Sequence, residues 1–491
     1  METKPVRRSA RPLTAAEVST WNDEADVVVV GFGVAGAAAA AGAAASGASV
    51  LAVERTSGWG GAAAMAGGFI YLGGGTALQK ACGFEDSPDD MYAFMKAAFG
   101  TGTNDEKLAI YAERSVEHFD WLVSCGVPFR AKFFDQPGWE PAADEGLMYC
   151  GGENAHPFAE TIRPAPRGHL PQMADKRTGE RGGGYMLVKP LVDTALASGV
   201  RLRTDSRFER LVIDADGSVC GIVVTTYGEK VAIRARRGVV LASGSFAYNA
   251  ELVEQHVPAL SGRPGSAIEE HDGQAMRAAQ WVGADVAHMD NCEVAIHADP
   301  GLMARSLVVN GLGQRFINED TYPGRIGVAT ALQQRNQALI VADQRAVDEA
   351  VAAPKGTRMI PPPNWVSDDV AELEAEAGLP QGSLAATLDA YNRSAAAGAD
   401  PLFHKAAQWL RPLEGPIGIF DVRGQTSGFP LGGLRTSVDG AVLDVDGDAI
   451  PGLYAAGRTT LGIAASNYAS GCSLGDGSFF GRRAGRAAAA V

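Results

Sequence analysis

The feature that most constrains the fold of this chain is a glycine-rich turn that directly follows a run of valines near the N-terminus. Residues 26–30 read Asp-Val-Val-Val-Val, and residues 31–36 read Gly-Phe-Gly-Val-Ala-Gly. A continuous β-branched run is typical of a strand that is buried on both faces of a parallel sheet. The alanine-rich segment that follows predicts a helix ending near Gly47, and residues 48–53 predict a second strand. This βαβ pattern predicts an α/β fold.

The three glycines of the turn have the spacing of a dinucleotide-binding site. Gly31 permits the tight turn, Gly33 lets a pyrophosphate approach the backbone, and Gly36 lets the helix pack closely on the strand. The first turn of the helix offers amide protons to the phosphates. Glu54, at the end of the second strand, is placed to accept a hydrogen bond from a ribose hydroxyl. These residues predict that the chain binds a dinucleotide.

The same region also resembles a membrane span in its length. Residues 27–53 carry no charge and are long enough to cross a bilayer. They consist mostly of alanine and glycine, and the glycines have the spacing described above, so a buried strand and helix fit this stretch better. No apolar stretch follows Arg7 and Arg8 before Trp21, so we expect no secretory or twin-arginine signal.

The net charge and the positions of the cysteines and histidines exclude several kinds of partner and site. The formal net charge of −14 argues against a nucleic acid or an anionic membrane surface as partner. The six cysteines lie far apart without a C-x-x-C pattern, and the eight histidines are scattered. We therefore expect no metal site and no disulfide framework, but reduced thiols in a cytoplasmic protein. His156 and His169 are expected at the surface.

Three later segments favour FAD over a nicotinamide dinucleotide. Residues 57–61 form a glycine-rich loop after the second strand, and residues 237–244 and 450–458 predict two more strands that end in small residues. Residues 471–484 predict a final helix, and the alanines after it are expected to fray. The chain has one G-x-G-x-x-G, so we expect no second nicotinamide-binding domain. The remaining candidates for contact with the cofactor are Ala35, Arg55, Gly60, Gly61, Ala62, Gly68, Ala242, Ser243, Gly244, Gly457, Arg458, Ser473 and Leu474.

Five segments together resemble the flavoprotein family of fumarate reductases, succinate dehydrogenases and 3-ketosteroid dehydrogenases. These segments span residues 26–68, 182–244, 310–319, 391–412 and 430–485. The resemblance implies a Rossmann-like FAD-binding domain that is split in sequence by an inserted α+β capping domain, which closes over the flavin.

The resemblance also implies domain limits and a mode of flavin attachment. We expect the first part of the FAD-binding domain at residues 24–282, the cap at 283–423 and the C-terminal part of the FAD-binding domain at 424–491. Family members with covalent flavin carry a histidine in the loop after the second strand. Residues 56–68 contain no histidine, so the implied FAD is noncovalent.

Two tyrosines stand where dicarboxylate enzymes of this family carry arginines. Tyr322 follows the Gly-Gln-Arg-Phe-Ile-Asn-Glu segment at or beside the place of one arginine, and Tyr468 stands at the place of the other. The dicarboxylate enzymes also have a substrate-binding histidine shortly before a Gly-Gly pair. No histidine lies shortly before the corresponding pair here, residues 432–433. A dicarboxylate would therefore bury two charges without partners, at several kcal/mol each. The substrate is expected to be neutral and largely apolar, with one polar group.

Within the family, these departures most resemble the 3-ketosteroid Δ4-(5α)-dehydrogenases, enzymes of steroid degradation. That resemblance implies that Tyr468 donates a hydrogen bond to the 3-keto oxygen with help from the amide of Gly471. It implies that Ser470 accepts the proton from carbon 4, that Tyr322 relays it to solvent, and that the hydride from carbon 5 goes to the flavin. A donor pair at the carbonyl oxygen would stabilise the enolate.

Three alternatives remain open at this stage. A 3-ketosteroid Δ1-dehydrogenase would use an additional tyrosine as its base, and Tyr149 is available for that role or for lining the pocket. A fumarate reductase-like enoate reductase is disfavoured by the missing arginines. A flavin carrier without activity is disfavoured by Tyr468, Ser470 and Gly471 beside the final helix. The electron acceptor is expected to be a quinone or a soluble carrier.

Overall fold

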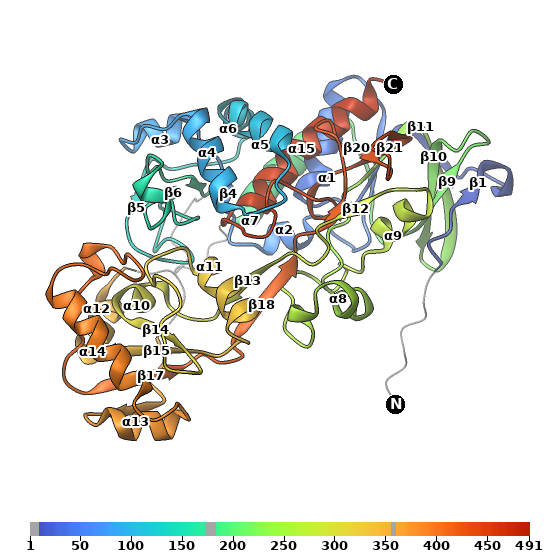
Figure 1. The fold of residues 1–491 in the computed structure, drawn as a ribbon. Coiled ribbons are helices and arrows are strands. Elements are labelled where there is room, and N and C mark those ends of the chain that lie inside the picture. Colours follow the sequence, from blue (N-terminus) through green and yellow to red (C-terminus); the bar gives the residue numbers. More distant parts are fainter. Residues whose placement is uncertain (1–8, 172–182, 355–359) are drawn as a thin grey trace.

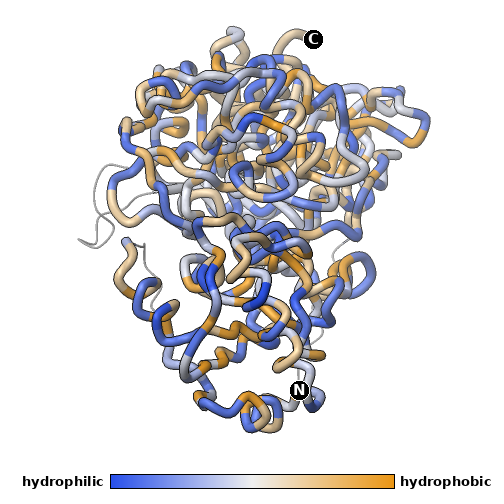
Figure 2. The backbone as a smooth tube through the Cα atoms, turned by 60° about the vertical axis from the view of Figure 1, so that its left-hand side comes forward, coloured by the Kyte–Doolittle hydropathy of each residue, from blue (hydrophilic) through white to orange (hydrophobic). Residues whose placement is uncertain are grey.

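The computed structural model describes residues 9–171, 183–354 and 360–491 of the chain and divides them into two lobes. Arg7, Arg8 and Gly182 lie outside these residues. Figure 1 shows a larger lobe, which contains the C-terminus, and a smaller lobe, drawn in yellow and orange, on one side of it. Figure 2 shows hydrophobic stretches in both lobes, and the buried residues form separate clusters in each.

The larger lobe is built on a nine-stranded sheet with parallel strands at its centre. The central strand β2 pairs in parallel with β3 on one side and with β11 on the other, and β21 is parallel to β11. One edge is an antiparallel meander of β9, β10 and β11. The strand order is β1 (Leu13–Thr14), β9 (Ser206–Ile213), β10 (Val219–Thr226), β11 (Glu229–Leu241), β2 (Asp23–Val30), β3 (Val50–Val53) and β8 (Arg201–Arg203), with β21 (Ala449–Ala455) and then β20 (Ala441–Leu443) branching from β11.

Two long helices of small residues pack against this sheet with their backbones in contact. Helix α1 spans Val34–Ala45 and helix α15 spans Cys472–Ala489. A Cβ atom added to Gly485 would lie 1.9 Å from the carbonyl oxygen of Ala39, so a side chain there would separate the helices. The uncharged stretch 27–53 is thus β2, α1 and β3, which confirms the predicted strand and helix. Among the described residues, no helix combines the length and apolar character needed to cross a membrane.

Further elements surround this core. The helices are α2 (Gly61–Met65), α3 (Ala77–Ala81), α4 (Pro88–Ala98), α5 (Asp105–Glu113), α6 (Ser115–Ser124), α7 (Gly184–Ala197), α8 (Ala250–His256) and α9 (Gln274–Trp281). A small sheet has the strand order β4 (Ile70–Tyr71), β7 (Gly168–His169), β6 (Leu147–Met148) and β5 (Phe133–Phe134).

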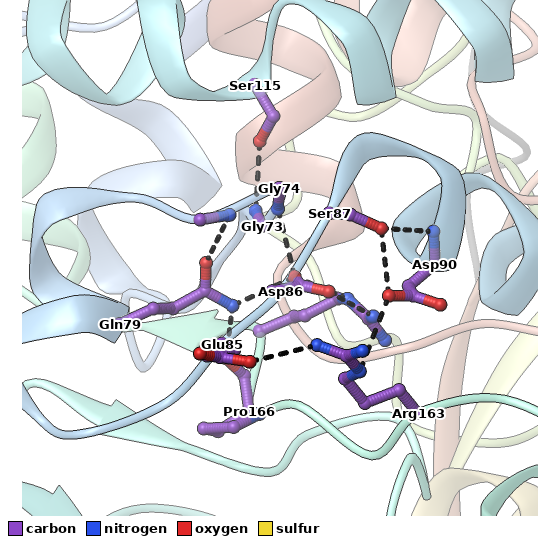
Figure 3. A network of polar contacts seen from close by, with 12 residues as sticks. Gly73, Gly74, Gln79, Glu85, Asp86, Ser87, Asp90, Ser115, Arg163 and Pro166 are labelled. Atoms are coloured by element: carbon purple, nitrogen blue, oxygen red, sulfur yellow. Dashed lines mark hydrogen bonds and ion pairs between the residues drawn. The ribbon is translucent and has the colours of Figure 1, made fainter.

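A buried polar network ties this small sheet to the helices beside it (Figure 3). The guanidinium of Arg167 is fully buried and pairs at 2.7 Å with the carboxylate of Asp86, which is equally buried. Asp86 also accepts hydrogen bonds from the Gly74 amide and the Gln79 side chain. His169 is buried and contacts Thr76 at 2.8 Å, so its predicted surface position is wrong. Because the small sheet buries both faces at this point, the ring cannot reach solvent.

The smaller lobe has its own four-stranded sheet and helices. Two antiparallel pairs, β12 with β19 and β13 with β18, join it to the larger lobe. The strands are β12 (Val286–Ala287), β13 (Cys292–Ile296), β14 (Leu307–Asn310), β15 (Ala338–Asp343), β16 (Trp365–Ser367), β17 (Ile417–Asp421), β18 (Thr426–Pro430) and β19 (Gly433–Leu434). The helices are α10 (Pro300–Arg305), α11 (Pro323–Val328), α12 (Gln344–Ala352), α13 (Val370–Ala377) and α14 (Ser383–Ala396).

This arrangement confirms the predicted α/β class and the split of the larger lobe by an inserted one. The limits at residues 283 and 423 stay a prediction. The expected fraying at the C-terminus is wrong, because α15 continues to Ala489 and both Ala488 and Ala489 are buried. All six cysteines are free.

Candidate functional site

A large cavity opens at the carboxyl ends of β2 and β11 and extends to the smaller lobe. It encloses about 1750 Å³ of empty space, part of which is open to solvent. Its lining runs from the glycine-rich turn in the larger lobe to Glu293 and Tyr322 in the smaller lobe. The residues predicted to hold the cofactor or to carry the Δ4-(5α) chemistry all line the cavity, apart from Gly36.

The glycine-rich turn forms the wall at the start of α1. Gly31 has a φ of 94°, and a Cβ atom there would lie 2.5 Å from the carbonyl oxygen of Ala242 on the neighbouring chain segment. A Cβ atom on Gly36 would lie 1.9 Å from the carbonyl oxygen of Gly31, which explains why Gly36 packs behind the turn and does not line the cavity. Glu54 accepts a hydrogen bond from the Phe32 amide at 2.9 Å.

The remaining walls of this end fit FAD. Gly60, Gly61 and Gly68 have φ values of 113°, 51° and 92°, which side chains rarely adopt, so the backbone of this loop faces the cavity without bulk. The Oγ atom of Ser473 and the Nε atom of Arg458 are buried in the cavity wall without a hydrogen-bond partner. Such groups call for partners from a bound molecule.

His271 and Asp272 are among the cavity residues at this end that the sequence analysis missed. His271 contacts the Ser245 hydroxyl at 3.1 Å, and burial lowers its pKa to about 4, so the ring is neutral at pH 7. Asp272 pairs with the predicted Arg55 at 3.0 Å. Neither residue belongs to a spaced motif, so the sequence offered no signal for them.

The other end of the cavity brings the predicted catalytic residues together. The Tyr322 hydroxyl lies 3.0 Å from the Ser470 hydroxyl, although the two are 148 positions apart in the chain. The side chain of Tyr468 is 8% exposed and packs edge-on against Phe429. Desolvation raises the pKa of both tyrosines, so their hydroxyls stay protonated. Further lining residues here are Phe69, Trp139, Glu293, Ala295 and Phe429.

The Tyr468 hydroxyl is held by the first turn of α15. It accepts a hydrogen bond from the Ser473 amide at 2.9 Å. This contact uses a lone pair of the hydroxyl and leaves its proton free to be donated. The chain reaches α15 through Gly471, whose φ is 101° and whose added Cβ atom would lie 2.5 Å from the Tyr71 amide nitrogen. A glycine is therefore needed where Tyr468, Ser470 and the helix meet.

Glu293 and Trp139 are the residues of this end that sequence reasoning missed. Glu293 lies on β13 and its Oε1 atom is 3.2 Å from the Tyr322 hydroxyl. An acidic residue inside the apolar run Cys-Glu-Val-Ala-Ile was the available signal. Tyr149 is not among the residues lining the cavity, and its ring packs against Phe84 and Phe133 instead.

One group outside the cavity bears on the expected absence of a metal site. Among the described residues, the fold brings potential ligand atoms of His156, Glu160 and His404 within 4.8 Å of one another. The two rings stack at 4.1 Å, and His156 hydrogen-bonds Glu160 at 2.7 Å. These contacts account for the grouping without an ion.

Comparison with known proteins decides the family. The model of the FAD binding domain family matches residues 26–474. The chain belongs to this FAD-binding family. Since the match spans both parts of the larger lobe and the inserted lobe, the cofactor of this flavoprotein is FAD, as predicted.

Three relatives of this flavoprotein share nearly its whole length. It is 58% identical to 3-ketosteroid-Δ4-(5α)-dehydrogenase from Rhodococcus jostii RHA1, whose crystal structure contains 4-androstene-3,17-dione; the match covers 98% of this chain and 99% of that one, with a TM-score of 0.95. It is 28% identical to the 3-oxo-5-alpha-steroid 4-dehydrogenase of Comamonas testosteroni, over 90% of this chain and 94% of the relative. It is 27% identical to the 3-oxosteroid 1-dehydrogenase of Mycobacterium tuberculosis H37Rv, over 93% of this chain and 97% of the relative.

Proposed function

We propose that this flavoprotein introduces a double bond between carbons 4 and 5 of a 3-keto-5α-steroid. One observation carries the proposal: Tyr468, whose hydroxyl is fixed by the Ser473 amide, lines the same cavity as the contacting hydroxyls of Ser470 and Tyr322. A ketone needs a proton donor at its oxygen and a proton acceptor at the neighbouring carbon. The 58% identity to a dehydrogenase of this specificity supports the same substrate class.

The contacts of each residue indicate its role in the proposed reaction. Tyr468 donates a hydrogen bond to the 3-keto oxygen, keeps its proton, and stabilises the enolate that forms as the proton leaves carbon 4. Ser470 accepts that proton, and Tyr322 takes over the hydroxyl proton of Ser470 across 3.0 Å. Bound FAD supplies the acceptor for the hydride from carbon 5. The apolar neighbours Phe69 and Phe429 exclude water from the enolate.

The cavity also disfavours a dicarboxylate substrate. Tyr322 and Tyr468 stand where a dicarboxylate enzyme of this family would place cations, and Glu293 adds a carboxyl group at the same end. A dicarboxylate would bury its charges there against neutral hydroxyls and apolar walls, at several kcal/mol. This supports a neutral steroid over fumarate or another enoate.

The 27% identity to a 3-oxosteroid 1-dehydrogenase makes Δ1 chemistry the second candidate. Tyr149 does not line the cavity, which disfavours it as an additional base for carbon 1. Product analysis separates the two candidates. The purified flavoprotein is given 5α-androstane-3,17-dione and a dye as electron acceptor, and the product is identified by mass spectrometry and NMR. We expect 4-androstene-3,17-dione. A double bond between carbons 1 and 2, or no turnover of any 3-ketosteroid, would refute the proposal.

The metabolic role, the cellular location, the flavin attachment and the electron acceptor also stay predictions. A role in steroid degradation and noncovalent FAD are implied by the family resemblance, and a cytoplasmic location is expected from the spacing of the cysteines. A quinone or a soluble carrier is the expected electron acceptor. Denaturation of the yellow protein tests the flavin attachment, because noncovalent FAD is released into the supernatant.

A further inference from the structure

Glu293 is a buried carboxyl group beside the reacting end of the cavity. The residue is 4% exposed and lines the cavity, and its Oε1 atom lies 3.2 Å from the Tyr322 hydroxyl. The Oε2 atom is buried without a hydrogen-bond partner. A carboxylate oxygen that is buried without a hydrogen-bond partner costs about 1–3 kcal/mol or more of folding stability. A contribution to stability therefore does not explain why Glu293 lies here.

The fold brings Glu293 and Tyr322 together through closely packed backbones. Tyr322 precedes α11, which packs against β13, the strand of Glu293. A Cβ atom on Gly327 would lie 2.0 Å from the carbonyl oxygen of Val294. A Cβ atom on Gly324 would lie 2.3 Å from the Tyr322 ring and 2.4 Å from the Glu293 Oε1 atom. The contact between the two side chains therefore depends on glycine at position 324.

Ser470, Tyr322 and Glu293 form a continuous chain of hydrogen bonds. The Ser470 and Tyr322 hydroxyls are 3.0 Å apart, and the next step to Glu293 is 3.2 Å. We propose that Glu293 is the terminal acceptor of this relay and stores the proton that leaves carbon 4 of the steroid. The proposal rests on the proposed function and replaces direct release to solvent by an internal acceptor.

The proton and electron balance of the step is complete. The C4–H bond breaks and an O–H bond forms at Ser470, whose own proton moves to the Tyr322 oxygen. The Tyr322 proton moves to Oε1 of Glu293, so the carboxylate becomes a carboxylic acid and both hydroxyls end neutral. The electron pair of the C4–H bond forms the new double bond, and the pair of the C5–H bond leaves with the hydride. Neither hydroxyl has to hold a charge in an apolar site.

Because Glu293 must be ionised to accept the proton, the rate of the proposed step depends on pH. Burial raises the pKa of Glu293 to about 8, so the group is protonated below that pH and accepts a proton only above it. The titratable groups around it are Tyr322, Tyr468, Cys292 and Cys472, and burial raises the pKa of each above its ordinary value. The nearby cation of α11, Arg325, faces Phe158 instead. Among these neighbouring groups, Glu293 is the one whose charge changes between pH 7 and 9.

The test compares Glu293→Gln with the natural protein in the half-reaction with steroid. Holoenzyme is mixed with 5α-androstane-3,17-dione without an electron acceptor, and flavin bleaching is followed by stopped flow from pH 6 to 10. We expect the natural rate constant to rise through about pH 8 and then level. The glutamine variant should be at least 10-fold slower at pH 9 and flat across this range, because its amide cannot accept a proton.

Three further variants separate proton storage from a structural effect. Glu293→Asp keeps an ionisable group and should retain a rise with pH at an intermediate rate. Gly324→Ala pushes Tyr322 and Glu293 apart and should reproduce the glutamine phenotype. Glu374→Gln removes another buried carboxyl, which accepts backbone hydrogen bonds in the smaller lobe, and should leave the rate and its pH profile unchanged. FAD content and product binding are measured for each variant.

Infrared difference spectra of a single turnover at pH 9 give a readout independent of rate. The carbonyl band of a newly protonated carboxylic acid should appear with flavin reduction in the natural protein and be absent in Glu293→Gln. An unchanged rate and pH profile in the glutamine variant, or no such band, would overturn the relay. If the natural protein does not reduce its flavin with the steroid, the proposed function itself fails, which is a separate outcome.

Discussion

At the scale of single residues, the chemistry depends on how each hydroxyl divides its hydrogen bonds. Tyr468 accepts from the Ser473 amide, so its proton is available to a ligand. Tyr322 sits between Ser470 and Glu293, so it can receive a proton on one side and pass one on at the other. In the proposed reaction, Tyr468 is therefore the hydrogen-bond donor to the steroid and Tyr322 the proton relay, although the two side chains are chemically identical.

Removing the donor should slow the chemistry without loss of the cofactor. We expect Tyr468→Phe to lower kcat by about 100-fold or more, which is the effect of deleting one oxyanion donor. Tyr149→Phe is the matched control, because its ring packs between phenylalanines away from the cavity. Steady-state assays with 5α-androstane-3,17-dione and FAD absorbance measure both effects. An active phenylalanine variant would remove Tyr468 from its role.

Sequence reasoning selected Tyr322 and Tyr468 because they stand where dicarboxylate enzymes of the family carry arginines, and Ser470 because of the resemblance to the ketosteroid dehydrogenases. The structure places all three at one end of the cavity. Glu293 escaped that reasoning, since a single acid in an apolar strand has no spacing that indicates a partner. Its contact with Tyr322 exists because α11 lies close on β13, and a sequence does not state such a distance.

At the scale of elements, close backbone packing explains the unusual glycine and alanine content of α1 and α15. There is no room for a Cβ atom at Gly42, Gly481 or Gly485. An added Cβ atom would lie 2.5 Å or less from a backbone oxygen of the other helix at each position. Close contact between the helices allows the first turn of both to reach the same cavity. The βαβ pattern predicted α1 and its strands well, but the full length of α15 followed from its burial.

A single methyl group between these helices should destabilise the protein. Gly485→Ala places a Cβ atom 1.9 Å from the Ala39 carbonyl oxygen, and we expect a loss of about 1–3 kcal/mol in the free energy of unfolding. The neighbouring Arg486→Ala, at an exposed position of the same helix, should change it by less than about 0.5 kcal/mol. Denaturant titration measures both. Equal stability of the two variants would contradict the packing argument.

At the scale of the whole molecule, the cavity is assembled from segments that are far apart in the chain. The two parts of the larger lobe supply the cofactor end, and β13 and the start of α11 bring Glu293 and Tyr322 from the inserted lobe. The polar network around Asp86 and Arg167 fixes the small sheet in this assembly (Figure 3). Through β4, that sheet supports Gly471, since the Tyr71 amide donates to the Gly471 carbonyl oxygen.

Breaking the buried ion pair should therefore be costly, whereas breaking an exposed one beside it should not. Arg167→Met leaves Asp86 buried and unpaired, and we expect a loss of about 3–5 kcal/mol in the free energy of unfolding. Arg163→Met breaks the exposed pair with Glu85 and should cost about 0–1 kcal/mol. Thermal and denaturant unfolding compare the two. Similar losses in both variants would refute the role of the buried network.

The sequence by itself determined the βαβ unit, the FAD-binding class and the replacement of arginines by tyrosines, because these depend on local spacing and residue type. Only the tertiary structure decided that Tyr149 lies outside the cavity, that His169 is buried and that Glu293 lies next to Tyr322. The physical reason is that hydrogen bonding and burial act over a few ångströms in space, between residues that packing brings together from distant parts of the chain.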